Sequence, residues 1–539
     1  MAPKTHQVFN QTPPLAGYDA FTADHCLIES ITRSGPEDAV VHLAEFGRLA
    51  GSAEAQQWAV DANAYPPALR THDRYGHRID EVDFHPSWHR LMAIAVGHGL
   101  HAYAGGVHLL RAARFYLWSQ VEAGHGCPIS MTYAALPALR TEPELAAEWE
   151  PLLAARDYLP GLDRTAAAKG AALVGMGMTE KQGGSDVRAN TTTALPAGDG
   201  SYLLTGHKWF CSAPMCDAFL VLAQAPGGLT CFLLPRVRPD GTRNTFLIQR
   251  LKDKLGNRSN ASAEVEFDAT YAVRVGAEGR GIATIIAMVA TTRLDCVLGS
   301  AALMRQALVQ AIHHARYRHA FGAALVDQPL MTNVLADLAL ESEAATTLAM
   351  RLAAAVDEGE DDLLRLGVAI GKYWVCKRGP AVAGEALECL GGNGYVEESG
   401  MPRLYREAPL NSIWEGAGNV NALDVVRALR REPAALDAYL REIGAASGAD
   451  RHFDHAVKDL FQSLADLAGI EAGARRLVER MALVLQGSLL VRYAPPEVAD
   501  AFCASRLGQD WGYAFGTLPR QLHHMALVDR AFPADAGEG

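Results

Sequence analysis

The sequence is organised around a glycine-rich turn in mid-chain, which reads Gly177-Met178-Thr179-Glu180-Lys181-Gln182-Gly183-Gly184-Ser185-Asp186. The two adjacent glycines allow the main chain to come close to a flat or phosphorylated ligand, because neither carries a Cβ. Thr179 and Ser185 each offer a hydroxyl and an amide N–H as hydrogen-bond donors. We therefore interpret this turn as a cofactor-binding loop.

The spacing of apolar residues along the chain changes twice, once near the turn and once near Gly281. Short apolar runs separated by Gly, Pro, Asp and Asn turns follow the glycine-rich turn, and this spacing is typical of a compact antiparallel β-barrel. The runs are Tyr202-Leu203-Leu204, Phe219-Leu220-Val221-Leu222, Cys231-Phe232-Leu233-Leu234, Thr245-Phe246-Leu247-Ile248 and Glu264-Val265-Glu266-Phe267. Before the turn and again from Gly281 onward, apolar residues recur at the helical period. The predicted fold class is therefore α+β, with helices on both sides of a barrel.

The length of 539 residues is too great for one ordinary hydrophobic core. The periods predict an N-terminal helical domain over residues 1–170, a β-barrel domain over 171–281 and a helical bundle over 282–433. An additional C-terminal helical domain is predicted over 434–539. The first thirty residues have the character of an arm that packs on a neighbour rather than of core.

Composition excludes several classes of protein. Apolar residues make up 49% of the chain and charged residues 20%, and no segment has the length and purity that a membrane helix requires. The start of the chain has no apolar stretch after Lys4, which argues against a secretory signal. Nine cysteines are scattered without Cys-x-x-Cys spacing, which indicates neither disulfides nor zinc. We expect a cytoplasmic protein with no metal and no membrane partner.

Three further motifs follow the loop, namely Lys208-Trp209-Phe210-Cys211-Ser212, Gly391-Gly392-Asn393-Gly394-Tyr395 and Trp414-Glu415-Gly416. In this order, the loop and the three motifs together resemble the acyl-CoA dehydrogenase family of flavoproteins. Lys181-Gln182 stands where most of the family has proline and glycine. One branch of the family is associated with the response to DNA alkylation damage. The Lys181-Gln182 sequence of the loop resembles this branch, and so do the opening residues and the helical region beyond residue 433. The family motifs cover residues 80–430, and the likeness to the branch extends to nearly the whole chain.

The resemblance implies that the protein binds FAD as a homo-oligomer, and we expect a tetramer. Arg318 precedes Phe321-Gly322 and would meet the flavin pyrophosphate of a neighbouring subunit, for which a planar guanidinium is suited. The alternative for Arg318 is a helix-terminal cation that stabilises the helix dipole. The full set of expected cofactor residues is Met176, Met178, Thr179, Gly184, Ser185, Trp209, Phe210, Cys211, Ser212, Arg318, Phe321, Gly391, Gly392, Ala417 and Asn419. Whether Cys211 or Ser212 faces the flavin stays open.

Glu415 is the expected catalytic residue. Desaturating an acyl thioester requires a base that removes the α-proton, and a carboxylate in a water-poor pocket has its pKa raised towards neutrality. Arg293, 25 residues before Arg318, has the spacing at which the family keeps an arginine beside the acyl-CoA channel. The alternative for Glu415 is an ordinary glutamate near a helix start, which the helix dipole favours. The alternative for Arg293 is a surface ion pair.

The resemblance to the alkylation-response branch implies binding of double-stranded DNA, although the net charge of −12 argues against indiscriminate binding. Arg427, Arg430 and Arg431 are spaced to share one helix face and are the expected DNA contacts. The arginines and lysines between residues 236 and 258 indicate a second positive surface on the barrel. A solvated surface is the default interpretation for each cluster.

Three functions therefore compete. The first is an FAD-containing flavoprotein of the alkylation response that binds DNA and has a dehydrogenase centre. The second is a metabolic short- or branched-chain acyl-CoA dehydrogenase without a role on DNA. The third is a DNA binder in which the flavin is structural and no turnover occurs.

Overall fold

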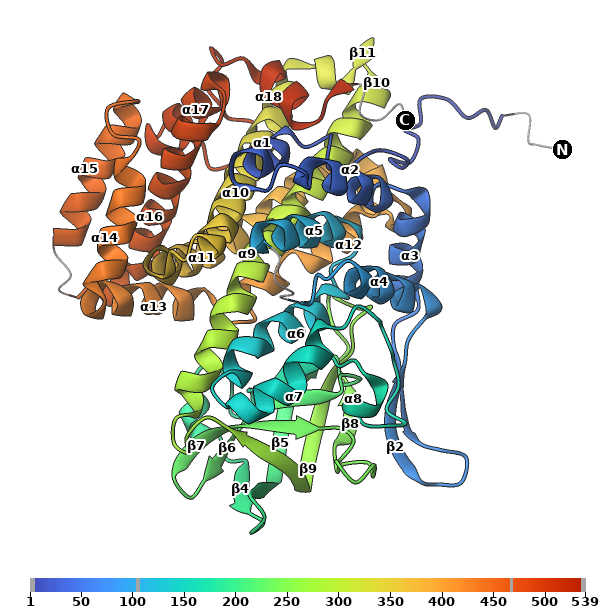
Figure 1. Cartoon of the computed structure of the whole chain (residues 1–539). Helices are drawn as coiled ribbons and strands as arrows, with labels where there is room; N and C mark the ends of the chain where they lie inside the picture. The colour runs from blue at the N-terminus through green and yellow to red at the C-terminus, as the bar shows by residue number, and fades with distance from the viewer. Residues whose placement is uncertain (1–4, 103–106, 466–468, 535–539) are drawn as a thin grey trace. The chain divides into compact units, whose positions relative to one another are not determined.

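The computed structural model describes residues 5–102, 107–465 and 469–534, and it forms two compact units (Figure 1). Unit 1 comprises residues 1–56, 107–121 and 296–539, and unit 2 comprises residues 57–106 and 122–295. These units do not test the division into four domains, which stays a prediction.

Unit 1 is helical. Its early helices are α1 (His25–Ser34), α2 (Ala39–Ala50), the start of α3 (Ala53–Ala64) and α5 (His108–Val121). They are followed by the second part of α9 (Gly281–Tyr317), α10 (Pro329–Asp357), α11 (Asp361–Cys389), α12 (Met401–Glu407) and α13 (Gly418–Arg431). The region after residue 433 adds α14 (Pro433–Gly444), α15 (Arg451–Ala465), α16 (Ile470–Tyr493), α17 (Pro496–Phe502) and α18 (His524–Ala531). The expectation of further helices in this last region is confirmed.

The core of unit 1 is built on α10 and α11, whose alanine-rich faces pack closely. A Cβ at Gly367 of α11 would lie 2.6 Å from Leu352 Cδ2 of α10, so a larger residue there would require the Leu352 side chain to move. Residues from Leu15 onward also enter the core, since Leu15, Tyr18 and Phe21 are buried. The expected arm is therefore limited to the residues before Leu15 within the described part of the chain.

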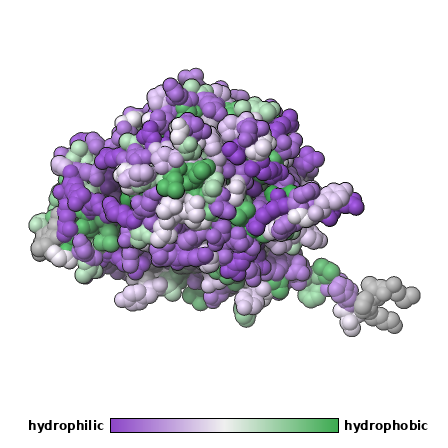
Figure 2. All heavy atoms as spheres, turned by 90° about the horizontal axis from the view of Figure 1, so that it is seen from below, coloured by the Kyte–Doolittle hydropathy of each residue, from purple (hydrophilic) through white to green (hydrophobic). Residues whose placement is uncertain are grey.

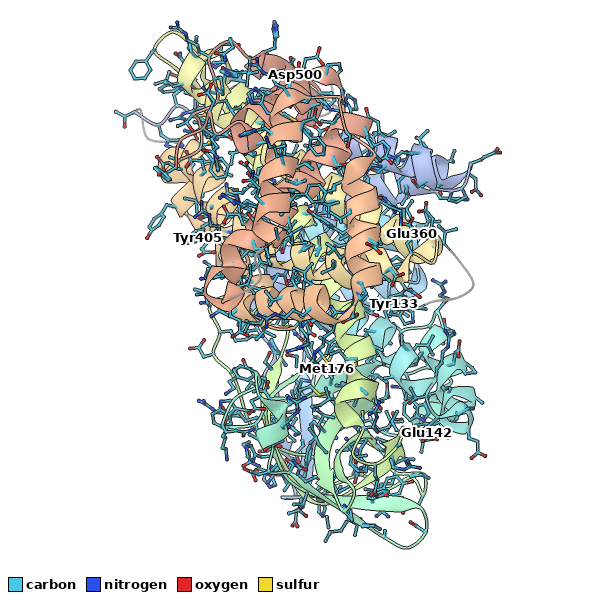
Figure 3. The ribbon with its side chains drawn as sticks, turned by 90° about the vertical axis from the view of Figure 1, so that its left-hand side faces the viewer. Tyr133, Glu142, Met176, Glu360, Tyr405 and Asp500 are labelled. Atoms are coloured by element: carbon cyan, nitrogen blue, oxygen red, sulfur yellow. The ribbon has the colours of Figure 1, made fainter. Side chains whose placement is uncertain are left out.

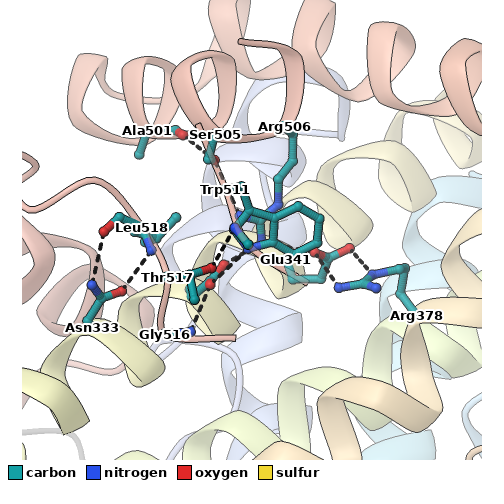
Figure 4. A network of polar contacts seen from close by, with 12 residues as sticks. Asn333, Glu341, Arg378, Ala501, Ser505, Arg506, Trp511, Gly516, Thr517 and Leu518 are labelled. Atoms are coloured by element: carbon teal, nitrogen blue, oxygen red, sulfur yellow. Dashed lines mark hydrogen bonds and ion pairs between the residues drawn. The ribbon is translucent and has the colours of Figure 1, made fainter. Parts of the chain in front are cut away.

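A buried ionic network joins the region after residue 433 to α10 and α11 (Figure 4). Arg506 lies in the π-turn Cys503–Leu507 and donates to Asp337 Oδ1 at 2.5 Å and to Glu341 Oε2 at 3.1 Å. Burial raises the pKa of Glu341, but Arg378 and Arg506 outweigh it and lower that pKa below its ordinary value. Asp337 Oδ2 accepts two more hydrogen bonds, from Trp511 Nε1 and the Gly516 amide.

One helix in the described part of the chain, α9, is long and apolar enough to cross a membrane by length and composition. It is a core helix, because residues such as Met304, Leu308 and Ile312 are buried inside the protein. On the face that Figure 2 shows, hydrophobic residues occur in small separate groups among hydrophilic ones. Such a surface is typical of a protein that faces water.

Unit 2 contains the predicted barrel together with several helices. The helices are the remainder of α3, α4 (Pro86–Gly97), α6 (Gly126–Leu139), α7 (Pro143–Ala154), α8 (Ala166–Lys169) and the first part of α9. It also contains a hairpin of β1 (Ala68–His72) and β2 (Arg78–Asp83). This hairpin lies in a region that the sequence predicts as mainly helical, because its strands carry few β-branched residues.

The barrel consists of β3 (Val174–Gly177), β4 (Thr193–Pro196), β5 (Ser201–Ser212), β6 (Ala218–Ala225), β7 (Gly228–Pro235), β8 (Leu247–Leu251) and β9 (Ser262–Val275). Its strand order is β3-β6-β4-β5-β9-β7, a further pairing of β6 with β7 closes the ring, and β8 pairs with β9. The five predicted strand runs correspond to β5, β6, β7, β8 and β9.

Two pairings in this barrel differ from the expected antiparallel arrangement. β3 pairs with β6 in parallel, from Val174 opposite Ala218 to Gly177 opposite Val221, and β4 meets β6 in parallel at one position. Parallel pairing is possible because the strands concerned are not joined by a tight turn. The remaining pairings are antiparallel, as predicted.

Candidate cofactor and acyl-CoA site

The predicted site residues divide between the two units. Those from Met176 to Ser212, together with Arg293, belong to unit 2, and those from Arg318 to Arg431 belong to unit 1. Each set is therefore described by itself.

The glycine-rich loop of unit 2 is anchored by a fully buried ion pair. Glu180 Oε1 accepts a hydrogen bond from Lys208 Nζ at 2.8 Å, and both side chains are 0% exposed. Glu180 also accepts from the amides of Thr191 and Thr192, at 2.6 Å and 3.2 Å. Burial alone would raise the pKa of Glu180, but Lys208 and these donors lower it to about 2. The carboxylate therefore fixes the centre of the loop from inside the barrel.

The loop is also joined to strand β5, which carries the second motif. The amide of Trp209 donates to Thr179 O at 2.8 Å, and the amide of Lys181 donates to His207 Nε2 at 3.0 Å. Gln182 donates to the side chain of Asn190 at 2.9 Å. The structure thus brings the two sequence motifs together within unit 2.

The exposure of the loop residues suits contact with a ligand. Gly184 and Ser185 are exposed, while Met176, Met178 and Thr179 are half-buried. Met176 lies on β3 and is labelled in Figure 3. Hydroxyls and backbone amides at a glycine-rich turn are donors for phosphate and carbonyl oxygens, so this chemistry fits a flavin cofactor.

Strand β5 presents Cys211 and Ser212 differently. Cys211 is completely buried inside the barrel, where its Sγ would lie 3.0 Å from a Cβ at Gly177. Burial raises the pKa of this thiol to about 12, so it stays protonated. Ser212 is half-buried, and Phe210, two residues earlier, is 50% exposed. Phe210 and Ser212 are therefore more accessible to a ligand than Cys211 is.

Two further expected residues of unit 2 have distinct surroundings. Trp209 lies beneath Lys252, whose Nζ is 3.7 Å from the centre of the indole ring and 4.5 Å from that of Phe210. Such a cation over an aromatic face fixes the orientation of the ring. Arg293 is buried on the first part of α9.

In unit 1, Glu415 lies in a tight turn before α13. Its φ is 58° and that of Gly416 is 95°, so two successive residues adopt the left-handed conformation. This conformation is uncommon for a residue other than glycine, and such strain concentrates at functional sites. The predicted base is therefore the residue that carries the strain.

The turn is held by donors from two helices. Lys372 on α11 is buried and donates from Nζ to Trp414 O at 2.7 Å and to Gly416 O at 2.6 Å, the carbonyls on either side of Glu415. Asn421 on α13 donates to Gly416 O at 2.5 Å. These contacts compensate for the strain, because they satisfy the carbonyls only in this backbone conformation.

Four expected cofactor residues lie near helix ends. Ala417 is the residue before α13 and Asn419 is exposed in its first turn. Gly391 and Gly392 begin the short 3₁₀ helix Gly391–Tyr395 after α11, and Gly391 has a φ of 59°. The amides at the start of α13 are oriented as anion donors, which suits the phosphates of a dinucleotide.

Arg318 and Phe321 belong to a small hairpin at the end of α9. Its strands are β10 (His319–Ala320) and β11 (Ala323–Ala324), and Phe321 and Gly322 form the tip with φ of 52° and 86°. Phe321 is 99% exposed. Arg318 Nη1 donates to the carbonyl of Asn10.

The three arginines expected to contact DNA are all exposed on α13. Arg427 is 3.4 Å from Asp424 Oδ1, and Arg430 is 3.6 Å from Glu471 Oε1. Their positive charge is therefore partly neutralised within the protein.

Part of the basic cluster expected on the barrel is buried or paired with acidic residues. Arg236 is buried and donates to the carbonyls of Pro214 and Asp80. Arg243 pairs with Glu81, and Arg250 and Lys252 both pair with Glu264. Acidic residues of other strands thus neutralise three members of this cluster, and single-sequence patterns do not reveal such long-range pairs.

Sequence reasoning missed the residues that hold the site. Glu180 and Lys208 lie within quoted motifs, but nothing in their spacing indicates that they pair. Lys372 interrupts an apolar helix, and a lysine in such a place indicates a buried partner without identifying it. No group of three or more His, Cys, Asp or Glu side chains suited to a metal ion occurs among the residues that the structure describes.

Comparison with known proteins places the chain in a family. Family profiles match the AidB N-terminal domain of adaptive response proteins at residues 10–160, the acyl-CoA dehydrogenase middle domain at 175–270 and the acyl-CoA dehydrogenase C-terminal domain at 279–430. The chain is 47% identical to AidB of Escherichia coli strain K12 over 515 residues, which cover 93% of this chain and 94% of that protein.

Two solved structures have a fold similar to that of this chain. The crystal structure of Caenorhabditis elegans ACDH-11 in complex with C11-CoA matches with a TM-score of 0.83 and 27% identity, over 93% of this chain and 94% of that one. Butyryl-CoA dehydrogenase from Megasphaera elsdenii matches with a TM-score of 0.56 over 70% of this chain and 97% of that one, and its 23% identity shows the fold alone. The predicted fold class is confirmed. The chain belongs to the acyl-CoA dehydrogenase family and carries the AidB N-terminal domain.

Proposed function

We propose that this protein is an FAD-dependent acyl-CoA dehydrogenase-like enzyme in which Glu415 is the catalytic base. The observation that carries the proposal is the strained turn at Glu415, with its φ of 58° and the Lys372 donors on both sides. A surface glutamate with no function would gain nothing from such a conformation. The ACDH-11 structure was solved with C11-CoA, which supports acyl-CoA as the substrate class.

In the proposed reaction, the carboxylate of Glu415 removes the proton on the α-carbon of an acyl thioester. When bound, FAD would supply the two-electron acceptor for the hydride that leaves the β-carbon, so that the acyl thioester would become its α,β-unsaturated form. Thr179, Ser185 and Ser212 provide hydroxyl donors for the flavin, and Phe210 provides an aromatic surface beside it. Cys211 takes no part, because its thiol is enclosed in the barrel. Lys372 and Asn421 hold the turn, so that the base does not move as it accepts the proton.

Arg318→Ala is expected to weaken FAD binding by about 10- to 100-fold, because a charge-assisted hydrogen bond to a phosphate contributes about 1.5–3 kcal/mol. Titration of apoprotein with FAD, followed by flavin fluorescence, measures the change. The matched control is Arg520→Ala, which removes an exposed arginine and should leave affinity unchanged. A folded wild-type protein that takes up no FAD would contradict the whole proposal.

We extend the proposal to the alkylation-damage response and to binding of double-stranded DNA. The identity with AidB supports the branch. One structural observation favours DNA, namely that Arg427, Arg430 and Arg431 are exposed together on α13. Asp424 and Glu471 partly neutralise the positive charge of Arg427 and Arg430, which limits the expected affinity for DNA. A cytoplasmic homotetramer would repeat this surface and so raise avidity. The alternative is a metabolic short- or branched-chain acyl-CoA dehydrogenase.

Replacing both Arg430 and Arg431 with Ala is expected to lower DNA affinity on every sequence alike and to flatten its salt dependence. Each lost phosphate contact reduces the slope of log K against log salt by roughly one unit, through reduced counterion release. Titration of duplex DNA at several salt concentrations measures both quantities, with Arg441→Ala on α14 as the control. Wild-type protein that binds no DNA at low salt would favour the metabolic alternative.

A further inference from the structure

The N-terminal arm, defined here as residues 5–14, contacts the hairpin that carries Arg318. Asn10 Nδ2 donates to His319 O at 2.8 Å, and the amide of His319 donates to Asn10 Oδ1 at 2.8 Å. One side-chain amide thus satisfies both backbone groups of one residue, as a neighbouring strand would. The two residues are 309 positions apart in sequence.

The same residue also orients Arg318. The carbonyl of Asn10 accepts from Arg318 Nη1, and the φ of 52° at Asn10 turns the backbone so that carbonyl and side chain reach adjacent residues. A guanidinium has five N–H donors in a fixed plane. Occupying one of them restricts the plane and leaves the others for an anion, since the Arg318 guanidinium makes no further hydrogen bond within the described residues.

Two more contacts hold the arm along the last turns of α9. Thr12 Oγ1 lies 3.0 Å from His314 Nδ1, and His313 Nε2 lies 2.8 Å from Pro13 O. The hairpin itself has strands of only two residues and a tip at Phe321 that is 99% exposed. Such a short hairpin has little burial to stabilise it, so contacts from outside determine its conformation.

We propose that Asn10 is a positioning residue, which holds the Arg318 hairpin in the conformation that receives the phosphate of the cofactor. This inference rests on the proposed function, in which Arg318 contacts FAD. It assigns to the arm a role in cofactor affinity, which the spacing of the family motifs does not indicate.

The decisive variant is Asn10→Gly. Glycine adopts a φ of 52° without strain and keeps the carbonyl that Arg318 contacts, so the change removes only the amide side chain. In apoprotein, hydrogen exchange of peptides that contain His319 should become roughly tenfold faster, because the amide loses its acceptor. FAD affinity should fall by roughly tenfold, equivalent to about 1.4 kcal/mol. Gln11→Ala, a change at the exposed neighbouring residue, should alter neither quantity.

A double-mutant cycle separates positioning from general destabilisation. If Asn10 acts through Arg318, Asn10→Gly should have no further effect on FAD affinity in a protein that already carries Arg318→Ala. An undiminished effect in that background, or unchanged affinity in the single variant, would overturn the inference. Wild-type protein that binds no FAD would instead refute the proposed function, while the exchange measurement would still report whether Asn10 holds the hairpin.

Discussion

Glu415→Gln is expected to lower the rate of acyl-CoA-dependent flavin bleaching by about 10²- to 10⁴-fold, the usual contribution of a positioned general base. The amide has the shape of the carboxylate, and both residues tolerate a φ of 58° equally, so the turn and bound FAD should be unchanged. Anaerobic mixing of the holoprotein with acyl-CoAs of several chain lengths, followed by flavin absorbance, measures the rate.

The control for this variant is Glu398→Gln, which makes the same change at an exposed glutamate of the turn Glu397–Ser399. It should bleach at the wild-type rate. Bleaching by Glu415→Gln at that rate would place the base elsewhere. If the wild type binds FAD but no acyl-CoA bleaches it, the third function, a binder with a structural flavin, becomes the better account.

Lys208→Met is expected to destabilise unit 2 by about 3–5 kcal/mol at pH 7, because it leaves Glu180 as a buried carboxylate without its cation. The carbonyl of Leu222 also loses a donor, at 2.7 Å in the native protein. Urea denaturation followed by tryptophan fluorescence measures the change. Lys181→Met is the matched control, since Lys181 is exposed and 3.4 Å from Glu266, and its loss should cost less than about 1 kcal/mol.

The loss of stability caused by Lys208→Met should depend on pH, in a direction that the pKa of Glu180 determines. In the wild type, the pKa of Glu180 is lowered to about 2, so its contribution is fully present above the unfolded pKa of about 4.3 and is lost as the pH falls towards 2. Without Lys208, burial raises the pKa of Glu180, and protonation relieves the variant as the pH falls. The difference in stability between wild type and variant should therefore narrow from pH 7 to pH 3. A constant difference would show that the ion pair is not its cause.

The sequence predicts the architecture well because periodicity is a local signal. The change from helical period to short strands near residue 170 and the return near Gly281 follow directly from the spacing of apolar and turn residues. This signal does not predict the hairpin β1–β2, because nearly all of its residues are exposed or only half-buried and its strands lack a clear alternation of apolar residues. The parallel pairing of β3 with β6 escapes it too, since period gives no direction.

The candidate site is predictable only where chemistry lies in contiguous motifs. Glu415 and the loop from Thr179 to Ser185 are named by their neighbours in sequence. Lys372 contacts carbonyls 42 and 44 positions away, and Asn10 contacts a residue 309 positions away, so neither partner is readable from spacing. Long-range hydrogen bonds of this kind form only in the folded chain, so no single sequence motif predicts them.

The network around Arg506 makes the stability of α10 depend on the region after residue 496. Asp337 and Glu341 lie on α10. Arg506, Trp511 and Gly516 donate four hydrogen bonds to these two carboxylates, and Arg378 on α11 donates the other two. A chain shortened before residue 496 would leave Asp337 buried without any of these donors, at a cost of several kcal/mol. The last helices are thus not an appendage on a self-sufficient smaller enzyme. We therefore expect that removing them destabilises α10 as well.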